Sequence, residues 1–121
     1  MISILLLVNQ SSISQGLHMC LSIEKDMVVL GNAYHIDNAF TLMKSLHPSV
    51  VLIDADTMNT DALALAQSFS KEYPGTKIIF LCLNADQPIW ALACSAGVAG
   101  IIGKTWSTSM LINTIRQVAI A

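Results

Sequence analysis

This chain has few charged residues. Only 12% of its 121 residues are Asp, Glu, Lys or Arg, against about 25% in average usage. The net charge is -2 and the six Lys and Arg are scattered, so no basic stripe indicates that this chain binds nucleic acid by itself. Hydrophobic residues make up 54% of the chain, which excludes intrinsic disorder. Because so few charged residues are available for the surface, we expect a partner to cover part of the surface.

Other signals are missing as well. No apolar run approaches the roughly 20 residues of a membrane helix, and the start, MISILLLVNQ, lacks the basic region and cleavage site of a signal peptide. The odd cysteine count, Cys20, Cys82 and Cys94, indicates buried, reduced thiols in a cytoplasmic protein without membrane contacts. We find no metal-ligand spacing, no glycine-rich phosphate loop and no Ser-His-Asp arrangement, and therefore expect neither an enzyme nor a dedicated metal site.

What the chain does have is a regular alternation of two patterns. Continuous apolar runs are typical of strands covered on both faces, as in a parallel sheet, and they occupy 2–8, 27–31, 50–54, 77–83 and 99–103. Helical periodicity follows each run, within 13–21, 36–43, 60–73, 87–96 and 107–119. Gly31, Pro74-Gly75 and Gly97 are expected to end elements. The pattern predicts one domain over 1–121, built from five strand–helix units with helices on both faces of a sheet.

Polar residues follow several of these strands, at the edge where parallel sheets carry their sites. Asn9 follows the first run, Asp54 ends the third, Cys82 ends the fourth and Lys104 follows the fifth. Asp54 closes the stretch VVLID, in which four apolar residues lead into a carboxylate. Asp56, two residues further on, is expected to face water and only to support the site.

The order of these residues resembles the receiver domain of bacterial response regulators. HPSVVLIDADTMNTDAL looks like the phosphoacceptor strand and its loop, KIIFLCLN like the fourth strand, and SAGVAGIIGKTWS like the segment with the family's lysine. Thr105 after Lys104 and the ending TIRQV resemble the branch that carries LuxR-type DNA-binding domains. The resemblance implies a flavodoxin-like (βα)5 three-layer sandwich, with a parallel five-stranded sheet of order 2-1-3-4-5.

The resemblance also implies a chemistry, from which this sequence departs. Asp54 would accept a phosphoryl group from a histidine kinase, and Mg²⁺ held by acids after the first strand would neutralise it. Val8 and Asn9 stand where the family has those acids. Cys82 replaces a hydroxyl residue, and Leu83 stands where the family prefers Ala or Gly and is expected to crowd Asp54. We therefore expect no cofactor, with Mg²⁺ binding weak or absent.

The expected function is that of a degenerate receiver, which signals by protein contact with magnesium-dependent phosphorylation lost or impaired. Asp54 would then be kept as the ion-pair partner of Lys104. Two alternatives stay open: a working phosphoacceptor receiver of a two-component system, phosphorylated at Asp54, and a flavodoxin-like enzyme or cofactor binder. The resemblance implies a histidine kinase or regulatory protein as a partner, and DNA contact only through a C-terminal domain absent from this chain.

Helical phase also predicts an apolar surface. In 87–96 it turns Ala93 and Cys94 inward, and in 107–119 it turns Leu111, Ile115 and Val118 inward. Exposed apolar patches with a Trp tend to mark protein contacts, so we expect a homodimer. The interface candidates are Ile89, Leu92 and Met110, which this phase leaves outside or at the rim, together with Trp106 in the turn before the last helix and Ile101 at the edge position of the fifth strand.

Overall fold

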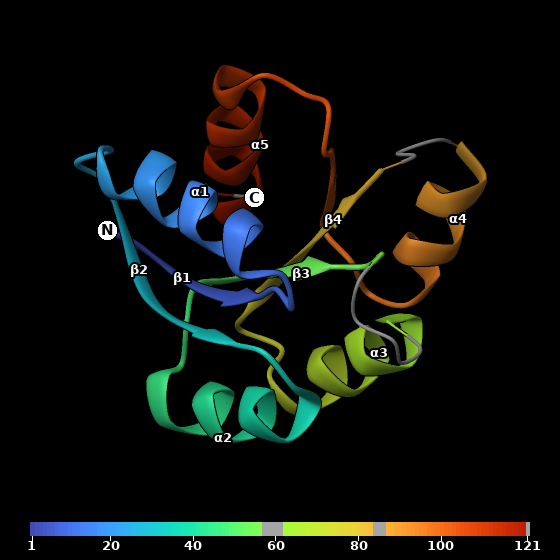
Figure 1. Ribbon diagram of the computed structural model, residues 1–121. Coiled ribbons are helices and arrows are strands. Elements are labelled where there is room, and N and C mark those ends of the chain that lie inside the picture. The colour runs from blue at the N-terminus through green and yellow to red at the C-terminus, as the bar shows by residue number, and fades with distance from the viewer. Residues whose placement is uncertain (57–61, 84–86, 121) are drawn as a thin grey trace.

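The computed structural model describes residues 1–56, 62–83 and 87–120, in which five parallel strands alternate with five helices (Figure 1). The strands are β1 (Ile2–Leu7), β2 (Met27–Ala33), β3 (Val50–Asp54), β4 (Lys77–Cys82) and β5 (Gly100–Gly103). The helices are α1 (Ser11–Ser22), α2 (Ile36–Leu46), α3 (Ala62–Glu72), α4 (Gln87–Ser95) and α5 (Thr108–Ile120). The sheet order β2-β1-β3-β4-β5 confirms the predicted fold class.

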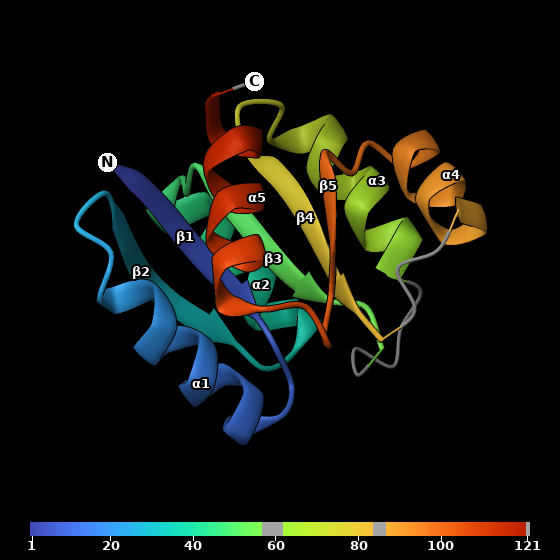
Figure 2. The same cartoon turned by 90° about the horizontal axis from the view of Figure 1, so that it is seen from above.

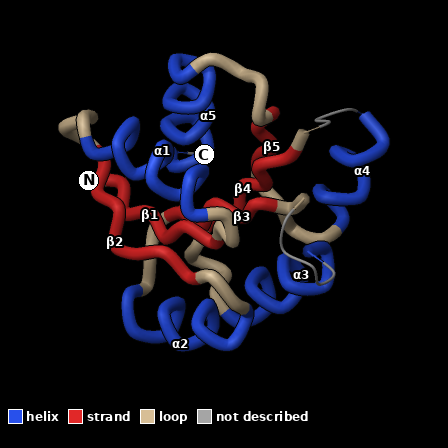
Figure 3. The backbone as a smooth tube through the Cα atoms, viewed as in Figure 1, coloured by secondary structure: helices blue, strands red, loops and turns tan. Residues whose placement is uncertain are grey.

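The sheet lies between two layers of helices, as Figure 2 and the tube in Figure 3 show. In β1, Ile4 and Leu6 belong to the apolar cluster beneath α1 and α5, whereas Leu5 and Leu7 belong to the cluster beneath α2, α3 and α4. Successive side chains of a strand point to opposite faces, so a strand buried on both sides must be apolar throughout. None of the helices in the described ranges is long and apolar enough to cross a bilayer.

The edge strand β2 differs from its prediction. The expectation that Gly31 ends this strand is wrong, because β2 continues beyond it. Ile4 of β1 pairs with Val29, but the next residue, Leu5, pairs with Gly31, which leaves Leu30 as an extra residue. This is a β-bulge, and a glycine inside a strand commonly accompanies one.

The helical phase was right for α5 and partly wrong for α4. Leu111, Ile115 and Val118 are buried as predicted. In α4, Ala93 is buried, but Cys94 is exposed, and it is Ala96 that shares the inner face with Ala93. Residues three apart lie on one side of a helix whereas adjacent residues do not, so only one of the pair Ala93 and Cys94 faces the sheet.

The end of α4 was also predicted correctly, at Gly97. This residue has a φ of 92°, which L side chains rarely adopt, and the Ser70 side chain fills the space where a Cβ would stand. Both the positive φ and the packing against Ser70 therefore require glycine at position 97.

An ion cluster joins α5 to the turn between α1 and β2. Arg116 Nη2 lies 2.7 Å from Glu24 Oε1, and Arg116 Nε lies 2.8 Å from Asp26 Oδ2. The hydrogen bond from Arg116 holds the pKa of Asp26 below its ordinary value, and the bonds to Asp26 and Glu24 raise the pKa of Arg116. The three side chains are between 29% and 46% exposed, so water screens them.

Candidate functional site

Asp54 ends the central strand β3 and has no exposed surface. The chain beyond it is held by neighbouring backbone, since Ala55 N–H donates to Leu81 C=O at 2.9 Å. On the other side of β4, Lys104 N–H donates to Cys82 C=O, also at 2.9 Å. These bonds bring the residues that follow β3, β4 and β5 to one edge of the sheet.

Lys104 neutralises the buried carboxylate. Its Nζ lies 2.8 Å from Asp54 Oδ1 and 3.0 Å from Asp56 Oδ2, so the structure contains the ion pair expected between Lys104 and Asp54. Burial by itself lowers the pKa of Lys104, but the hydrogen bonds and charges of Asp54 and Asp56 outweigh it and leave this pKa above its ordinary value. The lysine is therefore firmly protonated at neutral pH.

Asp56 is exposed as expected, with 38% of its side-chain surface accessible, but one of its carboxylate oxygens also turns toward the site. Its Oδ2 contacts Lys104 and also accepts a 2.7 Å hydrogen bond from Leu83 N–H, while its own N–H donates to Asp54 Oδ1 at 3.1 Å. The last contact is the familiar turn in which an aspartate accepts from the backbone two residues on. That local preference was the sequence signal from which the contact of Asp56 with the site could have been inferred.

The expected crowding of Asp54 by Leu83 is wrong. The Leu83 side chain is 59% exposed, and the part of this residue that faces the site is its backbone amide. A backbone donor leaves no trace in the residue type, so this role could not be predicted from the residue types alone.

The end of β1 brings no carboxylate to the site. Val8 is fully buried in the apolar cluster beneath α1 and α5, and its carbonyl oxygen accepts a 3.1 Å hydrogen bond from Asn32 Nδ2. Asn9 is exposed and Cys82 is buried. Of the predicted site residues, Lys104 contacts the side chains of both Asp54 and Asp56.

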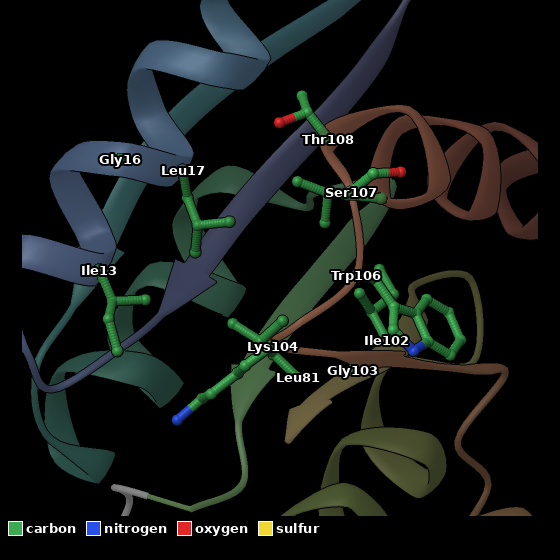
Figure 4. A pocket seen from close by; sticks show the side chains of 11 residues that line it. Ile13, Gly16, Leu17, Leu81, Ile102, Gly103, Lys104, Trp106, Ser107 and Thr108 are labelled. Carbon is green, nitrogen blue, oxygen red and sulfur yellow. The ribbon is translucent and has the colours of Figure 1, made fainter. Parts of the chain in front are cut away.

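A hollow of about 230 Å³ adjoins the site between α1 and the start of α5 (Figure 4). Its walls are mostly apolar, and Trp106 forms one side with its indole over Gly103. A Cβ on Gly103 would lie 2.5 Å from Trp106 Nε1, so the tryptophan depends on glycine there. Ser107 Oγ accepts from Met110 N–H at 3.3 Å and caps α5. Trp106 is consequently only partly available to a partner.

The interface candidates differ in exposure. Leu92 and Met110 are 58% and 47% exposed, and Trp106 is 36% exposed. Ile101 is half-buried against the cluster beneath α2, α3 and α4, and the side chain of Ile89 lies outside the described part of the structure. α4 and α5 cover opposite faces of the sheet, with β5 between them (Figure 2). The exposed candidates therefore lie on both sides of β5, with Leu92 lining a hollow toward α3 and Trp106 lining the hollow beside α1.

Comparison with known proteins agrees with this architecture. The model of the response regulator receiver domain family matches residues 4–116. The chain is 21% identical over 118 residues to the transcriptional regulatory protein DegU of Brevibacillus brevis, covering 98% of this chain and 50% of that protein. It is 25% identical over 118 residues to the response regulator UvrY of Escherichia coli, covering 98% and 54%. The chain thus spans about half the length of the curated relatives it matches.

Solved structures support the same fold. The receiver domain of the putative response regulator NarL from Mycobacterium tuberculosis superposes with a TM-score of 0.90 at 19% identity, covering 99% of this chain and 97% of that chain. A LuxR-family DNA-binding response regulator from Staphylococcus aureus gives a TM-score of 0.86 at 19% identity, covering 98% and 99%. With the family match over most of its length, the chain belongs to the response regulator receiver domains, which are signalling modules and not enzymes.

Proposed function

We propose that this receiver domain signals through protein contact and that its magnesium-dependent phosphorylation is lost or impaired. The observation that carries the proposal is the end of β1. Val8 has no exposed surface and packs in the apolar cluster beneath α1 and α5, and Asn9 brings no charge. Lys104 contacts two carboxylates at this edge, those of Asp54 and Asp56.

This donor set does not fit Mg²⁺. The ion demands a near-octahedral shell of oxygen atoms and usually binds through carboxylates. Lys104 Nζ contacts one oxygen of each site carboxylate, and its positive charge disfavours a second cation beside them. Within residues 1–56, 62–83 and 87–120, no three His, Cys, Asp or Glu residues cluster closely enough to hold a metal ion.

The alternative function is that of a working phosphoacceptor. Asp54 lies at the carboxyl end of the central strand beside a protonated lysine, which would favour negative charge on a phosphorylated aspartate. Relatives named as response regulators make this alternative reasonable, with a histidine kinase as the donor. A flavodoxin-like enzyme, the other alternative from the sequence, has no support in the family assignment.

Acetyl phosphate labelling separates the two functions. We expect no label on Asp54 in millimolar Mg²⁺, with Asp54→Asn as the matched control. Magnesium-dependent label that disappears in Asp54→Asn would establish the working receiver and overturn the proposal. In the converse variant, Val8→Asp with Asn9→Asp, we expect Mg²⁺ binding to appear, which can be followed by the NMR shifts of residues around Asp54.

We further propose that the exposed edge formed by Leu92, Trp106 and Met110 is the contact surface, used by a homodimer or by a regulatory protein. Apolar side chains of this size on a surface with few charges favour association. Contact with DNA would belong to a further domain of the whole protein. Sedimentation at micromolar concentration tests the homodimer, and Leu92→Glu and Met110→Glu should weaken it.

The control for that experiment is Met19→Glu, because Met19 is 69% exposed on α1 and lies away from the proposed edge. We expect this variant to associate like the wild type. A monomeric wild type that binds no partner through the edge, or equal association of all variants, would contradict the proposed surface.

A further inference from the structure

The Asp56 carboxylate lies where three parts of the chain meet. Its Oδ2 is 3.0 Å from Lys104 Nζ and 2.7 Å from Leu83 N, and the Asp56 N–H donates to Asp54 Oδ1. Asp56 Oδ2 thus contacts the ammonium group of Lys104, which follows β5, and accepts a hydrogen bond from the backbone amide of Leu83, which follows β4. The contact ties the chain after β3 to the ends of both neighbouring elements.

Lys104 Nζ and Leu83 N–H together form a small anion-binding pair. Hydrogen bonds between such donors and an ionised acceptor are short and about twice as strong as neutral ones. Lys104 Nζ is also 2.8 Å from Asp54 Oδ1, so the pair lies beside the carboxylate that the family phosphorylates. A phosphoryl group on Asp54 would bring about two negative charges and would need donors at this position, but both are already bound to Asp56.

We propose that Asp56 is a built-in substitute for the phosphoryl group: its carboxylate fills the anion site of Lys104 and Leu83 N–H and fixes the ends of β3, β4 and β5 without a phosphoryl donor. This inference deepens the proposed function and rests on it. The Asp56 carboxylate accounts for how the ends of β3, β4 and β5 stay in one arrangement when Asp54 carries no phosphoryl group.

The charge of the site supports the same inference. Two carboxylates and one ammonium group, in mutual contact, leave one net negative charge. A phosphoryl group would add further negative charge and would have to displace Asp56 from its two donors. Because like charges at this distance repel, Asp56 acts as a stand-in and also as a competitor.

The experiment is to empty the anion site and refill it. Asp56→Ala removes the carboxylate, and the Leu83 amide signal in a ¹H–¹⁵N NMR spectrum reports on the site directly. We expect that signal to move from its wild-type position, and we expect titration with inorganic phosphate to shift it saturably. One charge-assisted hydrogen bond is enough to change an affinity roughly tenfold or more, so phosphate should bind Asp56→Ala at least that much more tightly than wild type.

Three further variants keep the test decisive. Asp56→Asn keeps the side-chain volume and an acceptor for Leu83 N–H, so the amide signal should move in the same direction but less far. Asp56→Ala with Lys104→Met should lose the gained phosphate binding. Asp37→Asn removes an exposed carboxylate at the start of α2 and should behave as wild type.

An unchanged Leu83 amide in both Asp56 variants would overturn the inference, as would equal phosphate binding by wild type and Asp56→Ala. These outcomes are independent of acetyl phosphate labelling. A wild type that is labelled in Mg²⁺ refutes the proposed function, whereas the phosphate titration reports only on whether Asp56 occupies the anion site.

Discussion

The molecule contains two clusters of the same composition, one cation between two carboxylates, in very different surroundings. Lys104 with Asp54 and Asp56 lies at the carboxyl ends of the strands, where Asp54 has no exposed surface and Lys104 is 17% exposed. Arg116 with Glu24 and Asp26 joins helix α5 to the turn before β2, and each of its side chains is at least 29% exposed.

The difference shows that contact distances do not measure what an ion pair contributes. The shortest contacts of the two clusters are nearly equal, 2.8 Å and 2.7 Å. Exposed pairs stabilise little because water and salt screen them. Removing one partner from a buried pair is costly, since a charge is left in a medium that solvates it poorly. We therefore expect the stability of the fold to depend on the Lys104 cluster, whereas the Arg116 cluster should mainly position α5.

Lys104→Met should produce the largest effect. It takes the ammonium group from a carboxylate without exposed surface, so we expect the free energy of unfolding to fall by about 3–5 kcal/mol. Urea unfolding followed by circular dichroism measures it. Lys44→Met, at an exposed lysine in the last turn of α2, is the matched control and should change little. Equal losses in Lys104→Met and Lys44→Met would mean that the buried ion pair of Lys104 contributes no more to stability than an exposed lysine.

Asp54→Ala should have the next largest effect, a loss of about 1–3 kcal/mol. The loss is smaller than for Lys104→Met because the lysine keeps its contact with Asp56. In the double variant with Lys104→Met, part of the loss should be recovered, because neither charge is left buried. Additive losses in the double-mutant cycle would argue against direct coupling between Asp54 and Lys104.

Alkaline pH should weaken the buried cluster. The folded state raises the pKa of Lys104 above its ordinary value of 10.5, so folding favours the protonated lysine. The resulting stability is fully present below pH 10.5 and is lost as the pH rises through the folded-state pKa. The difference in unfolding free energy between wild type and Lys104→Met should therefore narrow above about pH 10.5. If the difference in unfolding free energy between wild type and Lys104→Met stayed constant above pH 10.5, the pKa of Lys104 would not be raised by folding.

Arg116→Met should have the smallest effect, and salt should reduce it further because the cluster is exposed. Folding lowers the pKa of Asp26 below its ordinary value of 3.8, so the contribution of Arg116 is present above that pH and is lost as the pH falls through the folded-state pKa. Thermal unfolding of wild type and Arg116→Met should thus converge in acid and in high salt. A difference that persists in both conditions would indicate that Arg116 acts through packing.

The fold could be predicted from the sequence because burial on both faces makes each strand a continuous apolar run. β1, β3 and β4 show this pattern most clearly. The bulge at Leu30 could not be predicted, because pairing register depends on the neighbouring strand and leaves no pattern in β2 alone. α4 was misjudged at Cys94 because a helix rich in small apolar residues gives a weak periodic signal.

The site was predictable only in part. The approach of Asp54 and Lys104 follows from parallel strands that end at one edge, and it required no side-chain detail. The contact of Asp56 with the site depends partly on its backbone bond to Asp54, which the local preference of aspartate indicates, and partly on the Leu83 amide, which no residue type reveals. Trp106 is exposed as predicted, but the packing of its ring over Gly103 could not be predicted, because it becomes visible only in three dimensions.

The two outer strands have a consequence for solubility in a chain that is 54% hydrophobic. An unpaired strand edge can recruit strands of other molecules and begin aggregation. β2 carries the Leu30 bulge, which interrupts its pairing pattern, and β5 on the opposite side has only four residues. Neither edge offers a long, regular template for another chain. Contacts between copies of this domain should consequently involve helices and loops and not strand edges. Deletion of Leu30 would remove the bulge, and we expect the straightened β2 edge to promote fibrillar assembly.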